Sequence, residues 1–108
     1  MERFGRVVSV KGDRIAVACQ GAVVLFDFDP SFNAWKQAGN PMVSEECGTS
    51  ELGFGYSIAL AGENGLLIGC PSDNDSVGTV RYYKRDTNTG GYIEQQKISP
   101  FDQQFSVT

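Results

Sequence analysis

The chain has 108 residues, which suits one small domain, and 41% of them are hydrophobic while 20% are charged. This composition excludes a disordered chain, and no apolar run approaches the roughly 20 residues of a membrane helix. The net charge of −4 disfavours a nucleic-acid binder. The sequence has no histidine, which removes Ser-His and Cys-His catalysis and histidine-based metal sites.

The first segments of the chain predict a β-hairpin. Met1-Glu2-Arg3 has no long apolar core, so we expect no signal peptide in this chain. Apolar residues then alternate on both sides of Gly12-Asp13, a pair suited to a tight turn. A period of two is typical of half-buried strands. The alternating positions are Val8, Val10, Ile15, Val17 and Cys19.

Two further strands and a loop complete the first half of the chain. A third strand is predicted over Ala22–Phe28, and a weaker fourth strand over Trp35–Gly39. Asp29–Asn33, which includes a proline, turns the chain between them. Asn40–Gly53 contains one proline and two glycines and is predicted to be a loop.

The second half of the chain predicts the same order of elements. A hairpin is expected around Glu63-Asn64-Gly65, because Asn-Gly is a strong turn signal. Strands are predicted over Thr79–Arg85 and Tyr92–Ile98, with a turn at Asp86–Gly91. No segment has a helical period. The alternating apolar positions of the hairpin are Ile58, Leu60, Leu66, Ile68 and Cys70.

These two halves are copies of one sequence pattern. Phe4–Asp13 recurs as Phe54–Glu63 at an offset of 50 residues, and the next two strands recur at offsets of 51 and 57. A repeat of about fifty residues with four short strands is typical of a propeller blade. The sequence therefore predicts an all-β fold of two four-stranded antiparallel blades, a partial β-propeller without significant helix.

Two short motifs make the repeat resemble a known family. Phe4-Gly5 and Phe54-Gly55 open the units, and Gly69-Cys70-Pro71 closes the second strand of unit two. This pattern resembles the FG-GAP repeat of integrin α-subunit propellers, in the subgroup whose calcium loop is replaced by a short hairpin. Unit one departs from it, with Ala18-Cys19-Gln20 where Gly-Ala-Pro is expected. The implied units are 1–53, 54–104 and, at 105–108, the start of a truncated third repeat.

The resemblance also implies what the module does. It implies a non-catalytic binding or adhesion module, extracellular or at the cell surface, that recognises a protein or glycan through its loops. Its partners would include further blades of the same chain or of neighbouring chains. Alternatives are a purely structural repeat array and a fragment of a propeller-type enzyme whose catalytic residues lie outside this chain.

The motif residues have structural roles in this interpretation. Phe4 and Phe54 would be aromatic wedges between neighbouring blades. Gly5 and Gly55 would permit close approach of a neighbouring backbone. Gly69 and Pro71 would end a strand where the chain leaves the sheet.

The three cysteines lack the spacing of a zinc site. Cys19 and Cys70 end equivalent apolar strands, so we expect buried free thiols there. Cys47 lies alone in the Ser/Glu/Gly-rich loop and is expected to be more exposed.

Few residues point to ligand chemistry. Asp73, Asn74 and Asp75 are the candidate calcium ligands, because alternating oxygen donors in a loop that ends with glycine suit Ca²⁺; a polar loop with Asx turns is the alternative. No other cofactor is expected. The basic cluster Arg81, Lys84 and Arg85 is interpreted as solvated charge on a strand that blocks unwanted pairing. Strand aromatics are candidates for a sugar- or peptide-binding surface or, alternatively, for packing: Phe26, Phe28, Phe32, Trp35, Tyr82, Tyr83 and Tyr92.

Overall fold

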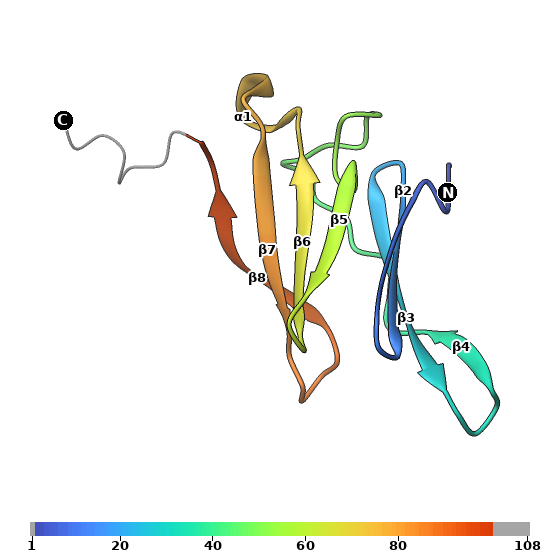
Figure 1. Ribbon diagram of the computed structural model, residues 1–108. Coiled ribbons are helices and arrows are strands. Elements are labelled where there is room, and N and C mark those ends of the chain that lie inside the picture. Colours follow the sequence, from blue (N-terminus) through green and yellow to red (C-terminus); the bar gives the residue numbers. More distant parts are fainter. Residues whose placement is uncertain (1, 101–108) are drawn as a thin grey trace.

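The chain folds into two antiparallel sheets of four strands each, which stand side by side (Figure 1). The computed structural model describes residues 2–100. Strands follow their order in the sequence within each sheet, so the prediction of an all-β fold with two four-stranded units is confirmed. We call the first sheet, β1–β4, blade 1 and the second, β5–β8, blade 2. The strands are β1 (Val7–Lys11), β2 (Arg14–Cys19), β3 (Ala22–Asp29), β4 (Ala34–Gln37), β5 (Ser57–Ala61), β6 (Gly65–Cys70), β7 (Thr79–Arg85) and β8 (Tyr92–Ile98).

Both first hairpins form where the turn residues predict them, but with different turns. In blade 1 the turn is Gly12-Asp13, and Gly12 has the left-handed φ of +58° that a tight hairpin requires. In blade 2 the left-handed residue is Gly62, with a φ of +61°, and Gly65 already belongs to β6. The Asn64-Gly65 signal therefore marks the correct hairpin but not its turning residue.

The segment between β6 and β7 holds the one short helix found within residues 2–100, α1 (Asp73–Ser76). It is a single turn, and Asn74 and Asp75 have left-handed φ values of +57° and +55°. No helix among the described residues is long and apolar enough to span a membrane.

The main core lies between the two sheets. Blade 1 contributes Ala18 and Val23, and blade 2 contributes Leu66 and Ile68, all with 0% exposure. In β5 and β6 the predicted alternating set, Ile58, Leu60, Leu66 and Ile68, faces blade 1. In blade 1 the other set, which includes Ala16 and Ala18, faces the core, so Val8 and Val10 lie on the opposite face. A hydrogen bond joins the first strands of the two sheets, where the Leu60 amide donates to Ser9 Oγ at 3.0 Å.

The two motif phenylalanines lie in different environments. Phe54 is completely buried between the blades, whereas Phe4 is 53% exposed on the other side of blade 1. Each packs edge-to-face on the equivalent aromatic ring of its own blade, Phe4 on Phe26 and Phe54 on Tyr83, both with centroids 6.2 Å apart. Among residues 2–100, only Phe54 has the wedge position that the repeat predicts for both.

The expectations for Cys47 and Cys70 are wrong. The two residues form a disulfide, and Cys47 is buried rather than exposed. The bond fastens the loop between the blades to the end of β6, 23 residues further along the chain. Cys19 is the free, buried thiol that the sequence predicts, and its Sγ donates to the Ala22 carbonyl at 3.5 Å. Cys70 had the same strand position as Cys19, so the repeat gave no indication that a distant loop would supply a partner.

Candidate functional site at the junction of the blades

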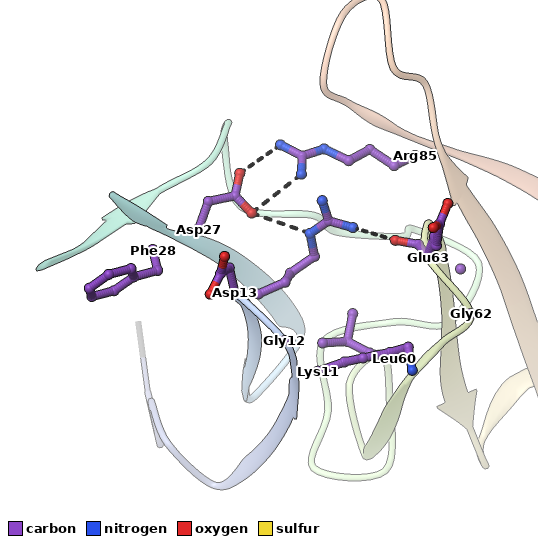
Figure 2. A pocket seen from close by; sticks show the side chains of 11 residues that line it. Lys11, Gly12, Asp13, Asp27, Phe28, Leu60, Gly62, Glu63 and Arg85 are labelled. Carbon is purple, nitrogen blue, oxygen red and sulfur yellow. Dashed lines mark hydrogen bonds and ion pairs between the residues drawn. The ribbon is translucent and has the colours of Figure 1, made fainter. Parts of the chain in front are cut away.

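A pocket of about 390 Å³ opens where the first hairpins of the two blades meet (Figure 2). The β1–β2 turn provides Gly12 and Asp13, and the β5–β6 turn provides Gly62 and Glu63. These turns are equivalent in the repeat, so stacking of the blades brings them to the same end of the molecule. The pocket is therefore a product of the repeat, because neither blade forms it alone.

The centre of the pocket is Asp27, on β3. From its own blade, Arg14 Nε lies 3.2 Å from Asp27 Oδ1, and from blade 2, Arg85 Nη2 lies 2.8 Å from Oδ2. A second donor of Arg85, Nη1, lies 3.3 Å from Oδ1. Arg14 also reaches blade 2, where its Nη1 donates to the Glu63 carbonyl at 2.9 Å. Figure 2 shows Asp27 and Arg85 facing each other across the pocket.

This arrangement fixes the charge of the carboxylate. Partial burial by itself would raise the pKa of Asp27, but the hydrogen bonds from Arg85 and Arg14 outweigh it and lower the pKa from its usual value of 3.8. The pKa of Arg85 is raised, chiefly by its hydrogen bond to Asp27. Both groups are therefore ionised at neutral pH, and neither is suited to general acid–base chemistry there.

Other charged side chains at the pocket have no ion-pair partner among the residues that the structure describes. Lys11, Asp13 and Glu63 line the pocket, and no ion pair joins their side chains to any other residue in 2–100. Lys11 and Asp13 are exposed at the turn and Glu63 lies opposite them on the second turn. These groups offer one donor and two acceptors to a bound molecule.

An aromatic hairpin adjoins this charged pocket. Phe28 lines the pocket and packs edge-to-face on Trp35, with ring centroids 5.3 Å apart. Phe32, in the turn between β3 and β4, is 68% exposed, and the Lys36 ammonium lies 3.6 Å from the centre of the Phe32 ring. Of the predicted aromatic surface, Phe28, Phe32 and Trp35 gather here, while Tyr83 belongs to the core and Tyr92 packs against it.

The candidate calcium residues lie far from this pocket, at the other end of β6. The carboxylate of Asp73 is already in use, because Oδ2 accepts from Thr79 Oγ1 at 2.7 Å and forms an ion pair with Arg81. Asn74 and Asp75 are exposed. Within residues 2–100, no group of three or more acidic or cysteine side chains is arranged to hold a metal ion.

The interpretation of the basic cluster is wrong for two of its three residues. Arg81 is 1% exposed in its side chain and pairs with three carboxylates, Asp73, Glu46 at 2.9 Å and Glu94 at 3.1 Å. Burial favours neutral Arg81, but these hydrogen bonds outweigh it and raise its pKa. Arg85 belongs to the interblade pocket described above. Only Lys84 is an exposed strand charge.

Sequence reasoning named Phe28 as a candidate for a ligand-binding surface and Arg85 as a solvated strand charge, but it missed Arg14 and Asp27. Arg14 and Asp27 are direct cross-strand partners in the β2–β3 pair, so opposite charge in a predicted hairpin was the available signal. The contact of Asp27 with Arg85 spans 58 residues and depends on how the blades stack.

Comparison of the chain with protein-family models gave no match, and comparison with curated proteins and with solved structures gave no significant similarity. The FG-GAP resemblance therefore stays a prediction that rests on the motifs and the repeat.

Proposed function

We propose that this chain is a non-catalytic binding module, part of an FG-GAP-like β-propeller, that recognises a protein or glycan through the turns at the junction of its blades. The observation that carries the proposal is the interblade pocket, where unpaired charges of both hairpin turns lie beside an exposed aromatic hairpin. Rigid strands that present variable turns are the usual arrangement of binding proteins.

The chemistry of the pocket suits recognition. Asp27 is held between two guanidinium groups, so its own charge is compensated within the protein and the three side chains together carry a net charge of +1. Lys11, Asp13 and Glu63 are then available for hydrogen bonds with a ligand, and Phe32 and Trp35 offer apolar rings to a sugar face or a peptide side chain. We infer that no catalytic step takes place here, since both sides of the central ion pair stay charged.

The disulfide supports an extracellular or cell-surface location. Cys47 and Cys70 join across the core of a small domain, and such bonds persist in oxidising compartments. Adhesion at the surface of a cell is the setting that the FG-GAP resemblance implies, and we include it in the proposal.

The test is a binding screen in which Trp35 is the reporter. It is the single tryptophan of the chain and contacts Phe28, which lines the pocket, so a bound ligand should change its fluorescence. The probes are a printed panel of neutral, sulfated and sialylated glycans and a library of random peptides. A hit should bind at least about tenfold more weakly to a double variant, Asp13→Asn with Glu63→Gln, as expected for lost hydrogen bonds to charged groups.

The matched control is Glu45→Gln, which removes an exposed carboxylate from the loop between the blades, outside the pocket. It should leave the affinity unchanged. A screen without hits, or a hit that the pocket variants do not weaken, would overturn the proposal and leave the junction a purely structural feature.

A further inference from the structure

The two blades pack head to tail, so each uses a different face. Blade 1 buries the face that carries Ala18 and Val23, while blade 2 buries the face that carries Phe54 and Ile68. In the repeat, Phe54 corresponds to Phe4, which lies on the opposite face of blade 1. One copy of each kind of face is consequently left without a neighbour within residues 2–100.

The uncovered face of blade 1 is apolar. Phe4, Val8 and Val10 are 53%, 53% and 61% exposed, and we call these three residues the leading face. Their equivalents in blade 2 are Phe54, Ile58 and Leu60, which pack against blade 1 as part of the core or its border. The leading face therefore has the apolar character of the surface of blade 2 that blade 1 covers in the junction seen within residues 2–100.

The uncovered side of blade 2 is a groove of about 700 Å³, which we call the trailing groove. Its lining is mainly apolar and includes Cys70, Gly78, Thr79, Val80 and Ile98. Val80 and Ile98 are 37% and 39% exposed. Their counterparts in blade 1 are Val23 and Met42, which are paired in the same way.

Val23 and its neighbours Cys19 and Ala22 lie against the Phe54-Gly55 turn in the existing junction. A Cβ on Gly55 would lie 3.1 Å from the Ala22 carbonyl oxygen, 3.3 Å from the Cys19 carbonyl oxygen and 3.3 Å from Val23 Cγ2. The residues equivalent to Cys19, Ala22 and Val23 are Cys70, Thr79 and Val80, all of which line the trailing groove. The trailing groove of blade 2 is thus equivalent to the site on blade 1 that binds the Phe54-Gly55 turn.

The leading face carries a Phe-Gly turn whose glycine has the same left-handed conformation as Gly55, although the first residue of the turn differs, because Arg3 has a φ of +62° and Gly53 is not left-handed. Gly5 has a φ of +92° and Gly55 a φ of +88°. Both turns close with the same hydrogen bond, from the Arg6 amide to the Arg3 carbonyl at 2.9 Å and from the Tyr56 amide to the Gly53 carbonyl at 3.2 Å. No atom outside its chain neighbours lies within 4 Å of a Cβ placed on Gly5, so this turn has space for a neighbour that Gly55 already has.

We propose that the trailing groove binds the leading face of a second copy of this chain, with Phe4-Gly5 of one copy seated between β6 and β7 of the next. The contact repeats the internal junction of the two blades, and it is heterologous, because two different surfaces meet. Its occupant is a second copy because the chain itself displays both halves of the contact, the turn and its seat.

The experiment measures the mass of the full chain by sedimentation and light scattering, from micromolar to near-millimolar concentration. The wild-type protein should form species larger than the monomer as its concentration rises. Val8→Glu on the leading face and Val80→Glu in the trailing groove should each weaken association by about tenfold or more, since either places a charge in an apolar contact. Val43→Glu is the control, because Val43 is 65% exposed in the loop between the blades and should have no effect.

Mixing the two variants tests the head-to-tail geometry. The Val8→Glu chain keeps its trailing groove and the Val80→Glu chain keeps its leading face, so an equimolar mixture should form a dimer and nothing larger. Association of either variant alone that equals the wild type would overturn the proposal, as would a mixture that stays monomeric.

A measurement on the wild-type protein does not depend on how the variants fold. Amide signals of ¹⁵N-labelled chain should shift with concentration at residues 4–10 and at 78–80 together, while the 32–36 hairpin stays unchanged. A chain that is monomeric throughout, whether its groove is open or covered by residues 101–108 of the same chain, would overturn the proposal.

Discussion

Arg85 of blade 2 donates two hydrogen bonds to the Asp27 carboxylate of blade 1, from Nη2 to Oδ2 at 2.8 Å and from Nη1 to Oδ1 at 3.3 Å. It is a charged contact at the junction of the blades, which also has hydrogen bonds from Arg14 to the Glu63 carbonyl and from the Leu60 amide to Ser9. Arg85 is 16% exposed in its side chain, so without the charge of Asp27 it would be partly buried without an ion-pair partner and would keep its hydrogen bond to the Gly90 carbonyl. This pair therefore holds the register of one blade on the other.

Asp27→Asn should lower the free energy of unfolding by about 1 kcal/mol, which is the upper range for partly exposed pairs. The measurement is urea unfolding at low salt and at molar salt. The loss should shrink at high salt, because screening already weakens the pair in the wild-type protein. Glu63→Gln is the control, since the Glu63 side chain has no ion-pair partner within residues 2–100 and only its carbonyl is used. An equal loss for both variants would contradict the prediction.

Stability should decrease in acid because of Asp73. Burial would raise its pKa, but hydrogen bonds from Arg81 and Thr79 outweigh it and lower the pKa below 3.8. The unfolded state then binds protons more readily, so the contribution of Asp73 is complete above the unfolded pKa and is lost as the pH falls through the folded pKa. The melting temperature should begin to fall as the pH approaches 3.8 and should fall further as the pH decreases through the lower pKa of the folded protein. Asp73→Asn should be less stable at neutral pH and show a shallower decrease in acid; a parallel curve would contradict this assignment.

The buried network around Arg81 predicts strong coupling between its members. Removing only the Asp73 carboxylate leaves Arg81 with two more exposed partners, Glu46 and Glu94, and should cost about 2 kcal/mol or more. In blade 1 the position of Arg81 is occupied by Val24, which is 2% exposed. Replacing both, with Asp73→Ala and Arg81→Val, should therefore cost much less than the sum of the two single changes. Chemical unfolding of the four proteins measures this coupling, and additive losses would refute it.

The disulfide should contribute about 3 kcal/mol, as expected from the 23-residue separation of Cys47 and Cys70. Thiol titration of the unreduced, denatured chain should find one free thiol, that of Cys19, and three after reduction. Thermal melts with and without reductant then measure the stabilisation. Reductant should have no effect on a Cys47→Ala with Cys70→Ala variant, whereas Cys19→Ala should keep the wild-type response. Three free thiols before reduction would contradict the assignment.

Calcium should leave the melting temperature unchanged. A cation at Asp73, Asn74 and Asp75 would have to displace Arg81 from the Asp73 carboxylate, and the buried guanidinium would lose its least exposed partner. Melts in millimolar Ca²⁺ and in chelator test this directly, because a ligand that binds only the folded protein must raise the midpoint. A clear increase that Asp75→Asn abolishes would restore the calcium site.

The local features of the fold were predictable from the sequence, and the long-range ones were not. Alternation over Ile58–Leu60 and Leu66–Ile68 predicts half-buried strands, and the structure pairs Ile58 directly with Ile68. Thr79–Arg85 and Tyr92–Ile98 were predicted with the bounds that β7 and β8 have. These signals lie within a few residues of one another in the chain.

Arg81 and Cys47 show why the long-range contacts of the fold could not be predicted from the sequence. Arg81 lies in the same strand as the charged residues Lys84 and Arg85, and its burial depends on carboxylates from a loop, from α1 and from β8. Cys47 lies in a polar loop that acquires a buried position only when it packs on blade 2. The interblade pocket has the same origin, because Arg85 and Asp27 come together only through stacking.

The left-handed glycine turn that opens each unit has a thermodynamic consequence. Gly5 already has the backbone shape of Gly55, although Gly5 faces open space and Gly55 a neighbouring sheet. The entropy of ordering this turn is therefore lost when each chain folds, not when two surfaces meet. If units assemble through this turn, its conformation is already ordered before they bind, so less conformational entropy is lost on association. A smaller apolar contact is then enough to give a stable complex.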